Sequence, residues 1–331
     1  MSVKWLVTCM TLPETQPGTL VKSWLDVLEF ADGTPVRLPI LVARGIDPGP
    51  KLVLTGALHG WEIVGTEVIR RVLREELEFR RLRGSVVAVP VANPLAFQVR
   101  AYITPHDHVD IGSAMPGDPS GTQSRRIASK LWEIIKDSTC YIDLHCMEGP
   151  SVPLTIVRGP EGGPIVEETL RIASAFGFPV TRPSPETLKR RPNTAADLAI
   201  SQGIPAIIPE LPFPSIMMDK NSVSMGIRGV LNVMKYLKMI PGEPERQPNI
   251  IDLGGPIHTM MISSNRGGIA HPICELGSKV RKGDPIVRLM NVFGEEVEVV
   301  KAPKDGYVVS FPLNVNQVAG SGDFVALLGY R

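Results

Sequence analysis

Polar side chains that can hold a metal ion follow three short apolar runs of the chain. The stretch LTGALHGWE, at 54–62, places His59 and Glu62 three residues apart where an apolar run ends. His145 closes a second such run, and Glu210 lies near the end of a third. Two imidazoles and a carboxylate that leave one position open are the ligands of a catalytic zinc ion. Such an ion activates a water molecule, for which a second carboxylate can act as general base.

These residues can meet only if the apolar runs become neighbouring strands of one sheet. Runs of strand length alternate with stretches of helical apolar spacing, which predicts an α/β fold with a mixed, largely parallel sheet flanked by helices. The predicted strands are 51–58, 85–92, 140–145 and 205–211, and the predicted helices are 62–77, 122–137, 194–202 and 222–239. Asn193 is expected to cap the third helix and Gly203 to end it. Because ligands bind beyond the carboxyl ends of parallel strands, the polar residues are expected to converge there.

The composition changes towards the C-terminal end of the chain. The segment 241–253, which begins PGEPERQPN, predicts a linker between a catalytic domain at 1–240 and a smaller domain at 254–331. Short apolar strands and glycine turns predict that the smaller domain is all-β. Two similar stretches, at 268–284 and 306–323, form a weak internal repeat and indicate two similar halves.

The smaller domain resembles the barrel-sandwich fold of biotinyl and lipoyl domains. Those carriers present a modifiable lysine at a hairpin tip, whereas the matching turn here, NVFGEE at 291–296, contains no lysine. We therefore expect a domain that packs against the catalytic domain or restricts access to it, rather than a swinging carrier arm.

The composition of the whole chain excludes several classes of protein. The 331 residues carry a formal net charge of +1, so no strong field attracts nucleic acid or a membrane surface. The four cysteines (Cys9, Cys140, Cys146, Cys274) form no C-x-x-C pair, which excludes a zinc ribbon and fits a reducing compartment. The stretch KWLVTCM, at 4–10, predicts a first strand rather than a signal peptide. We expect a cytoplasmic protein with no nucleic-acid or membrane partner.

Five motifs together give a more specific indication. They are GALHGWEIVG (56–65), VPVANPLAF (89–97), PGDPSGTQSRRIASKLW (116–132), IDLH (142–145) and IPEL (208–211). In this order they resemble the succinylglutamate desuccinylase/aspartoacylase family of zinc amidohydrolases, related to the zinc carboxypeptidases, over about residues 50–240. The resemblance implies a zinc-carboxypeptidase-like fold with one Zn²⁺ held by His59, Glu62 and His145. It also implies that Glu210 is the general base and that Asp143 orients a ligand imidazole.

The residues that recognise substrate in that family differ here. The family carries an Arg and then an Asn-Arg pair, and the aligned positions are Tyr102, Gly112 and Ser113. Because an arginine fork is hard to replace at a carboxylate site, N-acyl-aspartate and succinylglutamate are not the expected substrates. Arg100 could replace the carbonyl-polarising Arg if the segment is extended, and Tyr102 could donate to an oxyanion. Arg158 is a further candidate for substrate contact.

Other polar groups are expected to be structural. The motif HDH, at 106–108, predicts an exposed loop near the site entrance rather than a metal pair. Cys146 is predicted to be a buried thiol on the opposite strand face from the ligands. His258 and His271 are assigned to the β domain.

The function that these observations favour is zinc-dependent hydrolysis of an amide bond in a small N-acylated amine or amino acid. A metallocarboxypeptidase is a weaker alternative, because the carboxylate clamp is lost. A catalytically silent binding protein on the same fold is the third, although it would have no chemical need for the retained ligands and base. The sequence does not decide whether the protein forms a homo-oligomer through the β domain.

Overall fold

The computed structural model describes residues 11–147, 149–190, 192–212, 219–311 and 318–331. The strand predicted at 4–10, including Cys9, lies outside these described residues.

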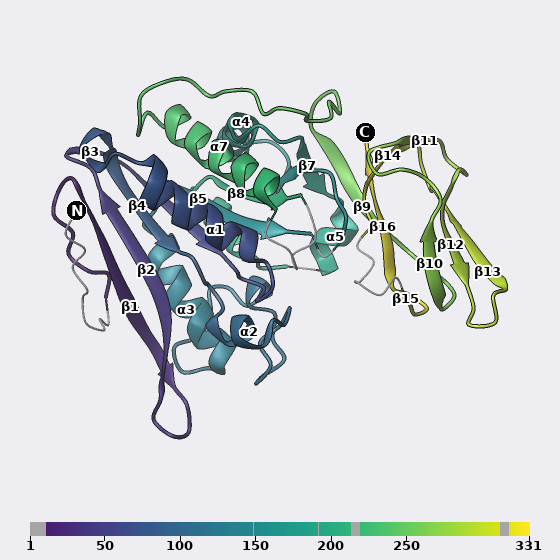
Figure 1. Ribbon diagram of the computed structural model, residues 1–331, viewed down its shortest axis with the longest axis horizontal. Coiled ribbons are helices and arrows are strands. Elements are labelled where there is room, and N and C mark those ends of the chain that lie inside the picture. The colour runs from purple at the N-terminus through teal and green to yellow at the C-terminus, as the bar shows by residue number, and fades with distance from the viewer. Residues whose placement is uncertain (1–10, 148, 191, 213–218, 312–317) are drawn as a thin grey trace.

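A twelve-stranded mixed sheet runs through the described chain (Figure 1). Its order is β1-β2-β4-β3-β5-β8-β6-β7-β9-β16-β14-β11. The strands up to β9 are β1 (Thr19–Glu29), β2 (Pro35–Arg44), β3 (Asp47–Gly56), β4 (Arg83–Val89), β5 (Cys140–Cys146), β6 (Leu154–Ile156), β7 (Val180–Pro183), β8 (Ala206–Leu211) and β9 (Ile257–Ser263). The four strands predicted from the apolar runs, β3, β4, β5 and β8, are adjacent and mutually parallel. Strands β2 and β6 run antiparallel to their neighbours β4 and β8, and β1 runs antiparallel to β2.

Helices cover both faces of this sheet. They are α1 (Ile63–Arg71), α2 (Pro94–Val99), α3 (Gln123–Ile135), α4 (Pro164–Phe176), α5 (Pro185–Arg190), α6 (Ala195–Ser201) and α7 (Lys220–Tyr236). Strand β5 shows how the faces divide: Ile142 and Leu144 pack with α1 and α7, whereas Tyr141 packs with α3 on the other face. The predicted helix at 62–77 is α1 followed by a π-helical turn at 72–76. Alternation along the strands therefore sorts the apolar residues into two cores.

The start of α6 differs from the prediction. Thr194, not Asn193, is the N-cap: its hydroxyl accepts from the Asp197 amide, and the Asp197 carboxylate accepts from the Thr194 amide. This reciprocal capping box satisfies two helix-end donors, which an Asn193 cap would not do. Gly203, with a φ of +80°, follows the helix as predicted.

Two glycines allow α1 to lie directly against the sheet. A Cβ at Gly65 would be 2.8 Å from both the Cβ and the carbonyl oxygen of Leu144 in β5. A Cβ at Gly56, where β3 ends, would be 2.9 Å from the backbone carbon of Gly65. Glycine is needed where backbones approach this closely. The close approach carries Glu62, at the start of α1, to the carboxyl end of β5.

The sheet continues into the C-terminal region without a break. Strand β9 pairs in parallel with β7, with Thr181 opposite Ile257, and β16 pairs with β9. The predicted linker has no helix or strand, but Gln247 is buried and its amide donates to the carbonyls of Phe176 and Met225. The predicted linker is thus tied to α4 and α7.

A separate four-stranded antiparallel sheet follows, in the order β13-β12-β10-β15. The remaining strands are β10 (Gly268–Pro272), β11 (Lys279–Val280), β12 (Pro285–Met290), β13 (Glu296–Lys301), β14 (Gly306–Ser310), β15 (Val318–Ala319) and β16 (Phe324–Tyr330). Strands of each repeat pair with strands of the other, β10 with β15 and β11 with β14. The β12–β13 turn that lacks a lysine exposes Phe293, which is 86% accessible.

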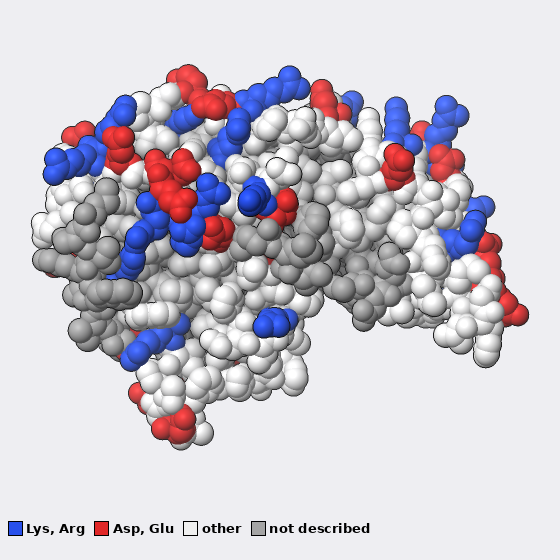
Figure 2. Space-filling model, viewed as in Figure 1, with Lys and Arg blue, Asp and Glu red and all other residues white. Residues whose placement is uncertain are grey.

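Charged side chains of both signs are mixed on the molecular face in Figure 2. Over α1, Arg70 pairs with Glu67 and Glu75. Within the described residues, none of the helices combines the length and the apolar character that crossing a bilayer requires.

Candidate metal centre

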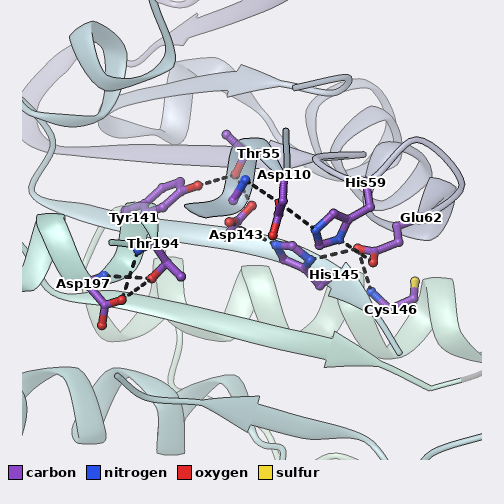
Figure 3. A network of polar contacts seen from close by, with 11 residues as sticks. Thr55, His59, Glu62, Asp110, Tyr141, Asp143, His145, Cys146, Thr194 and Asp197 are labelled. Atoms are coloured by element: carbon purple, nitrogen blue, oxygen red, sulfur yellow. Dashed lines mark hydrogen bonds and ion pairs between the residues drawn. The ribbon is translucent and has the colours of Figure 1, made fainter. Parts of the chain in front are cut away.

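Three predicted ligands come together at the carboxyl ends of β3 and β5. The carboxylate of Glu62 lies between two imidazoles: its Oε1 is 2.7 Å from His59 Nδ1 and its Oε2 is 2.8 Å from His145 Nδ1 (Figure 3). All three side chains are buried, and their ligand atoms lie within 4.8 Å of one another. Figure 3 shows His59 and Glu62 reaching from the β3–α1 turn and His145 from β5. The spacing in the sequence therefore does produce one compact cluster.

Strand register places the other predicted residues beside this cluster. Thr55 in β3 is opposite Asp143 in β5, and His145 is opposite Glu210 in β8. Side chains of paired residues point to the same face of a sheet. Glu210, which is 8% exposed, therefore emerges on the same face as His145, and both line one pocket.

Each ligand imidazole also faces a second carboxylate through its other nitrogen. His145 Nε2 is 3.1 Å from Asp143 Oδ2, and His59 Nε2 is 3.4 Å from Asp110 Oδ1. Asp143 is itself held by the hydroxyl of Thr55, which donates to Oδ1 at 2.5 Å. Carboxylate–histidine pairs of this kind fix the ring orientation of metal ligands, leaving the opposite nitrogen for the ion.

The carboxylates dominate the electrostatics of the cluster. Burial alone lowers the pKa of His59, but the charge of Glu62 and the hydrogen bond to Asp110 outweigh it and raise that pKa to about 9. The same competition, with Asp143 and Glu62, raises the pKa of His145 well above its usual range. Burial raises the pKa of Glu62, yet the two imidazoles lower it to about 2. The cluster is thus built to stabilise positive charge at its centre.

The donor set fits a divalent metal ion. Two imidazole nitrogens and a carboxylate are ligands that suit zinc, whereas calcium and magnesium prefer oxygen alone. The carboxylates behind both rings supply the outer contacts that metal-binding histidines generally have.

The pocket beside the cluster is lined by residues from many parts of the chain. Its lining includes Leu58, His59, Glu62, Tyr102, Asp110, Gly112, Ser113, Asp143, His145, Ile156, Arg158, Thr187, Thr194, Ile208, Glu210, Thr259, Met261, Phe324 and Leu327. Tyr102 stacks on the His59 ring, with the ring centroids 3.8 Å apart and 14° between the planes. Gly112 and Ser113 also line the pocket, so all three positions that we aligned with the family's polar anchors are pocket residues.

Arg158 lies in the same pocket and is 6% exposed. Its Nε donates to Asp197 Oδ2 at 2.9 Å. That oxygen also accepts from the Thr194 hydroxyl at 2.8 Å and from the Thr194 amide at 3.1 Å (Figure 3 shows Thr194 and Asp197). The guanidinium is therefore held by the capping box of α6.

Other predicted residues lie elsewhere. Arg100 takes a left-handed conformation, with a φ of 55°, as the C-cap of α2, so the expected extended segment is absent there. Its side chain is exposed, and it is not among the described residues that line the pocket. His106 and His108 are exposed, as expected for a loop, while Asp107 between them accepts from Ser124 at the start of α3.

Cys146 is buried in the core on the α1 side of the sheet, as predicted. Burial raises the pKa of its thiol well above the usual range, so it stays protonated at neutral pH. His258, in β9, packs its ring 5.8 Å from that of Tyr330, and His271 lies in β10, so both belong to the C-terminal strands.

Sequence reasoning missed Asp110 and Asp197. Asp110 lies two residues after the HDH motif, and its Oδ1 accepts from the Gly112 amide at 2.8 Å. An Asp two residues before a Gly is a signal for such a turn, but only the fold shows that the turn lies against His59. For Asp197, the T-x-x-D spacing from Thr194 was the available signal.

Comparisons with known proteins agree with this geometry. A family model for the succinylglutamate desuccinylase/aspartoacylase catalytic domain matches residues 48–237. An N-alpha-acetyl-L-2,4-diaminobutyric acid deacetylase from Halomonas elongata is 25% identical over 304 residues, covering 88% of this chain and 85% of that protein.

Two solved structures share the fold over nearly the whole chain. The product-bound ectoine utilization protein EutE (DoeB) from Ruegeria pomeroyi has a TM-score of 0.84 at 22% identity, covering 97% of this chain and 98% of that one. A succinylglutamate desuccinylase/aspartoacylase from Rhodobacter sphaeroides has a TM-score of 0.83 at 26% identity, covering 95% and 96%. Because the family model spans more than half of its length, this chain belongs to the succinylglutamate desuccinylase/aspartoacylase family of deacylating hydrolases.

Proposed function

We propose that this protein is a zinc-dependent deacylase that hydrolyses the amide bond of a small N-acylated amine or amino acid. The observation that carries the proposal is the buried His59–Glu62–His145 cluster with Glu210 beside it in strand register. A catalytic site needs metal ligands and a separate proton carrier in one pocket, and these residues supply both.

His59, Glu62 and His145 would hold the ion, and Asp110 and Asp143 would orient the two rings. When bound there, zinc supplies a Lewis acid and lowers the pKa of water towards neutrality. The protein contributes buried ligands whose orientation is fixed before substrate arrives.

Glu210 is the general base and then the general acid in this proposal. Its carboxylate accepts a proton from the attacking water, and delivers that proton to the amide nitrogen as the carbon–nitrogen bond breaks. The products are a carboxylic acid and an amine. In this proposal Tyr102, whose ring stacks on that of His59, would donate a hydrogen bond to the carbonyl oxygen as negative charge develops on it.

The deacetylase from Halomonas elongata gives the first substrate to try. We expect the zinc-loaded protein to release acetate and a free amine from N-alpha-acetyl-L-2,4-diaminobutyrate or from another small N-acetyl amine in a panel. The measurement is the appearance of primary amine by fluorescence, with dipeptides as a comparison for carboxypeptidase activity. Failure to hydrolyse any N-acyl amine when zinc is bound at full occupancy would overturn the proposal.

Replacing Asp110 by Asn should weaken the metal site without destroying it. Loss of a carboxylate behind a ligand imidazole typically costs about 10–100-fold in metal affinity or activity. We expect Asp110→Asn to bind zinc more weakly by a factor in that range, as measured by competition with a chromogenic chelator. Asp118→Asn, in an exposed turn, is the matched control and should bind zinc like the unmodified protein. Equal affinity in the two variants would remove Asp110 from the site.

A further inference from the structure

Arg158 is a buried cation that the proposed chemistry leaves without a role. It lies in the same pocket as the metal cluster, and it is 6% exposed. Asp197 binds its Nε, and Arg158 lines the pocket that a substrate of the proposed reaction would enter. Its planar fork matches the geometry of a carboxylate.

Arg158 follows β6, the strand that pairs with the Glu210 strand β8. Leu154 in β6 is opposite Glu210, and Ile156 is opposite Ile208. Arg158 lies four positions after Leu154 and two after the last residue of β6, so at about 3.3 Å per residue at most roughly 13 Å of chain separates it from the level of Glu210. The strand register therefore places the Glu210 carboxylate and the Arg158 guanidinium at two different levels of the pocket.

Apolar side chains line the part of the pocket between these levels. Ile156 and Ile208 are opposite one another there, and both line the pocket. Met261, Phe324 and Leu327, from β9 and β16, contribute further apolar surface. Such a wall suits a chain of methylene groups between two polar ends of a substrate.

We propose that Arg158 binds a carboxylate of the substrate and that Asp197 is its positioning residue. This inference rests on the proposed deacylase function and adds the substrate class, an N-acyl compound with a carboxylate several bonds from the scissile amide. The Asp197 oxygen that accepts from Arg158 Nε is fixed by two donors of Thr194, so the plane of the guanidinium is fixed as well. The anion site thus lies on β6 and α6, rather than at the family's positions Gly112 and Ser113.

The carboxylate can belong to either half of the substrate, and the assay separates the two sources. Amine-side probes are N-acetylglycine, N-acetyl-β-alanine and N-acetyl-γ-aminobutyrate, each paired with its carboxamide. The acyl-side probe is N-succinyl-butylamine, paired with its carboxamide. The ratio of kcat/KM for each carboxylate to that for its carboxamide measures recognition of the anion alone.

Replacing Arg158 by Gln should lower kcat/KM for the preferred carboxylate by about 10–100-fold, the range for a hydrogen bond to a charged group, mostly through KM. The carboxamide should change by less than about threefold, because its neutral group does not need the guanidinium charge. Arg158→Lys, which keeps the charge without the fork, should recover part of the preference. Arg171→Gln, an exposed arginine on α4, is the matched control and should leave both rates unchanged.

Asp197→Ala should reduce the carboxylate preference while Arg158 is still present. It also removes half of a capping box and so lowers stability, but a purely structural loss would affect carboxylate and carboxamide alike. Equal losses on both members of each pair, for both variants, would overturn the proposal.

A separate binding measurement distinguishes this failure from failure of the deacylase function. If the unmodified protein turns over none of the probes, calorimetric titration with the same pairs tests the anion site directly. Tighter binding of a carboxylate than of its carboxamide, lost in Arg158→Gln, would support the site. Absence of that difference would refute it whatever the reaction.

Discussion

Glu210→Gln should greatly slow deacylation while the zinc site stays filled. Glutamine has the same shape as glutamate but cannot accept a proton from water or return it to the leaving nitrogen. General acid–base catalysis contributes typically 10²–10⁴-fold, so we expect kcat to fall by about that factor. Because Glu210 is not one of the three clustered ligands, zinc should still bind at about one ion per chain. Rate and metal content should be measured on the same preparation.

Two further variants make this test specific. Glu243→Gln changes an exposed surface carboxylate that pairs with Lys238, and it should keep the full rate. Glu210→Asp keeps a carboxylate on a side chain that is shorter by one methylene group, so it should retain intermediate activity. Full activity of Glu210→Gln, with zinc bound, would show that another group carries the proton.

His59→Ala should lose the metal and the activity together. The substitution removes one of three ligands and leaves Glu62 and His145 as the remaining pair. We expect elemental analysis to find about one zinc per chain in the unmodified protein and far less in the variant. The rate should fall below detection, because without the ion neither the carbonyl nor the water is activated.

Thermal unfolding provides a second measure of the same site. A ligand present at 100 times its Kd stabilises the folded state by about 2.7 kcal/mol, so chelation should lower the Tm of the unmodified protein. The Tm of His59→Ala should not respond to the chelator. His258→Ala, in β9 outside the cluster, is the control and should bind zinc and respond normally. Lack of zinc in the unmodified protein, even after incubation with the ion, would contradict the assignment.

The candidate metal cluster could be predicted from the sequence because its signals are local. His59, Glu62, His145 and Glu210 each stand where an apolar run ends, and parallel strands bring such ends to one edge of the sheet. The apolar runs also predicted the four central strands, since buried parallel strands read as continuous apolar sequence.

Features that depend on distant contacts could not be predicted in this way. Asp110 lies in an irregular loop, and nothing in its neighbours indicates that it reaches His59. The pocket wall of Met261 and Phe324 comes from strands more than a hundred residues beyond His145. The prediction that Asn193 caps α6 was wrong for a different reason. Asn and Thr are both common N-cap residues, and only the reciprocal hydrogen bonds between Thr194 and Asp197 decide between them.

The pairing of β9 with β7 has a consequence for the evolution of this protein. A chain that ended at residue 240 would leave the backbone groups of β7 open on one side, which invites pairing with other molecules. It would also remove Thr259, Met261, Phe324 and Leu327 from the pocket. Exchange of the C-terminal strands between relatives would therefore alter both the sheet and the pocket. A recombined chain that keeps this architecture would need both the register against β7 and the side chains that line the pocket.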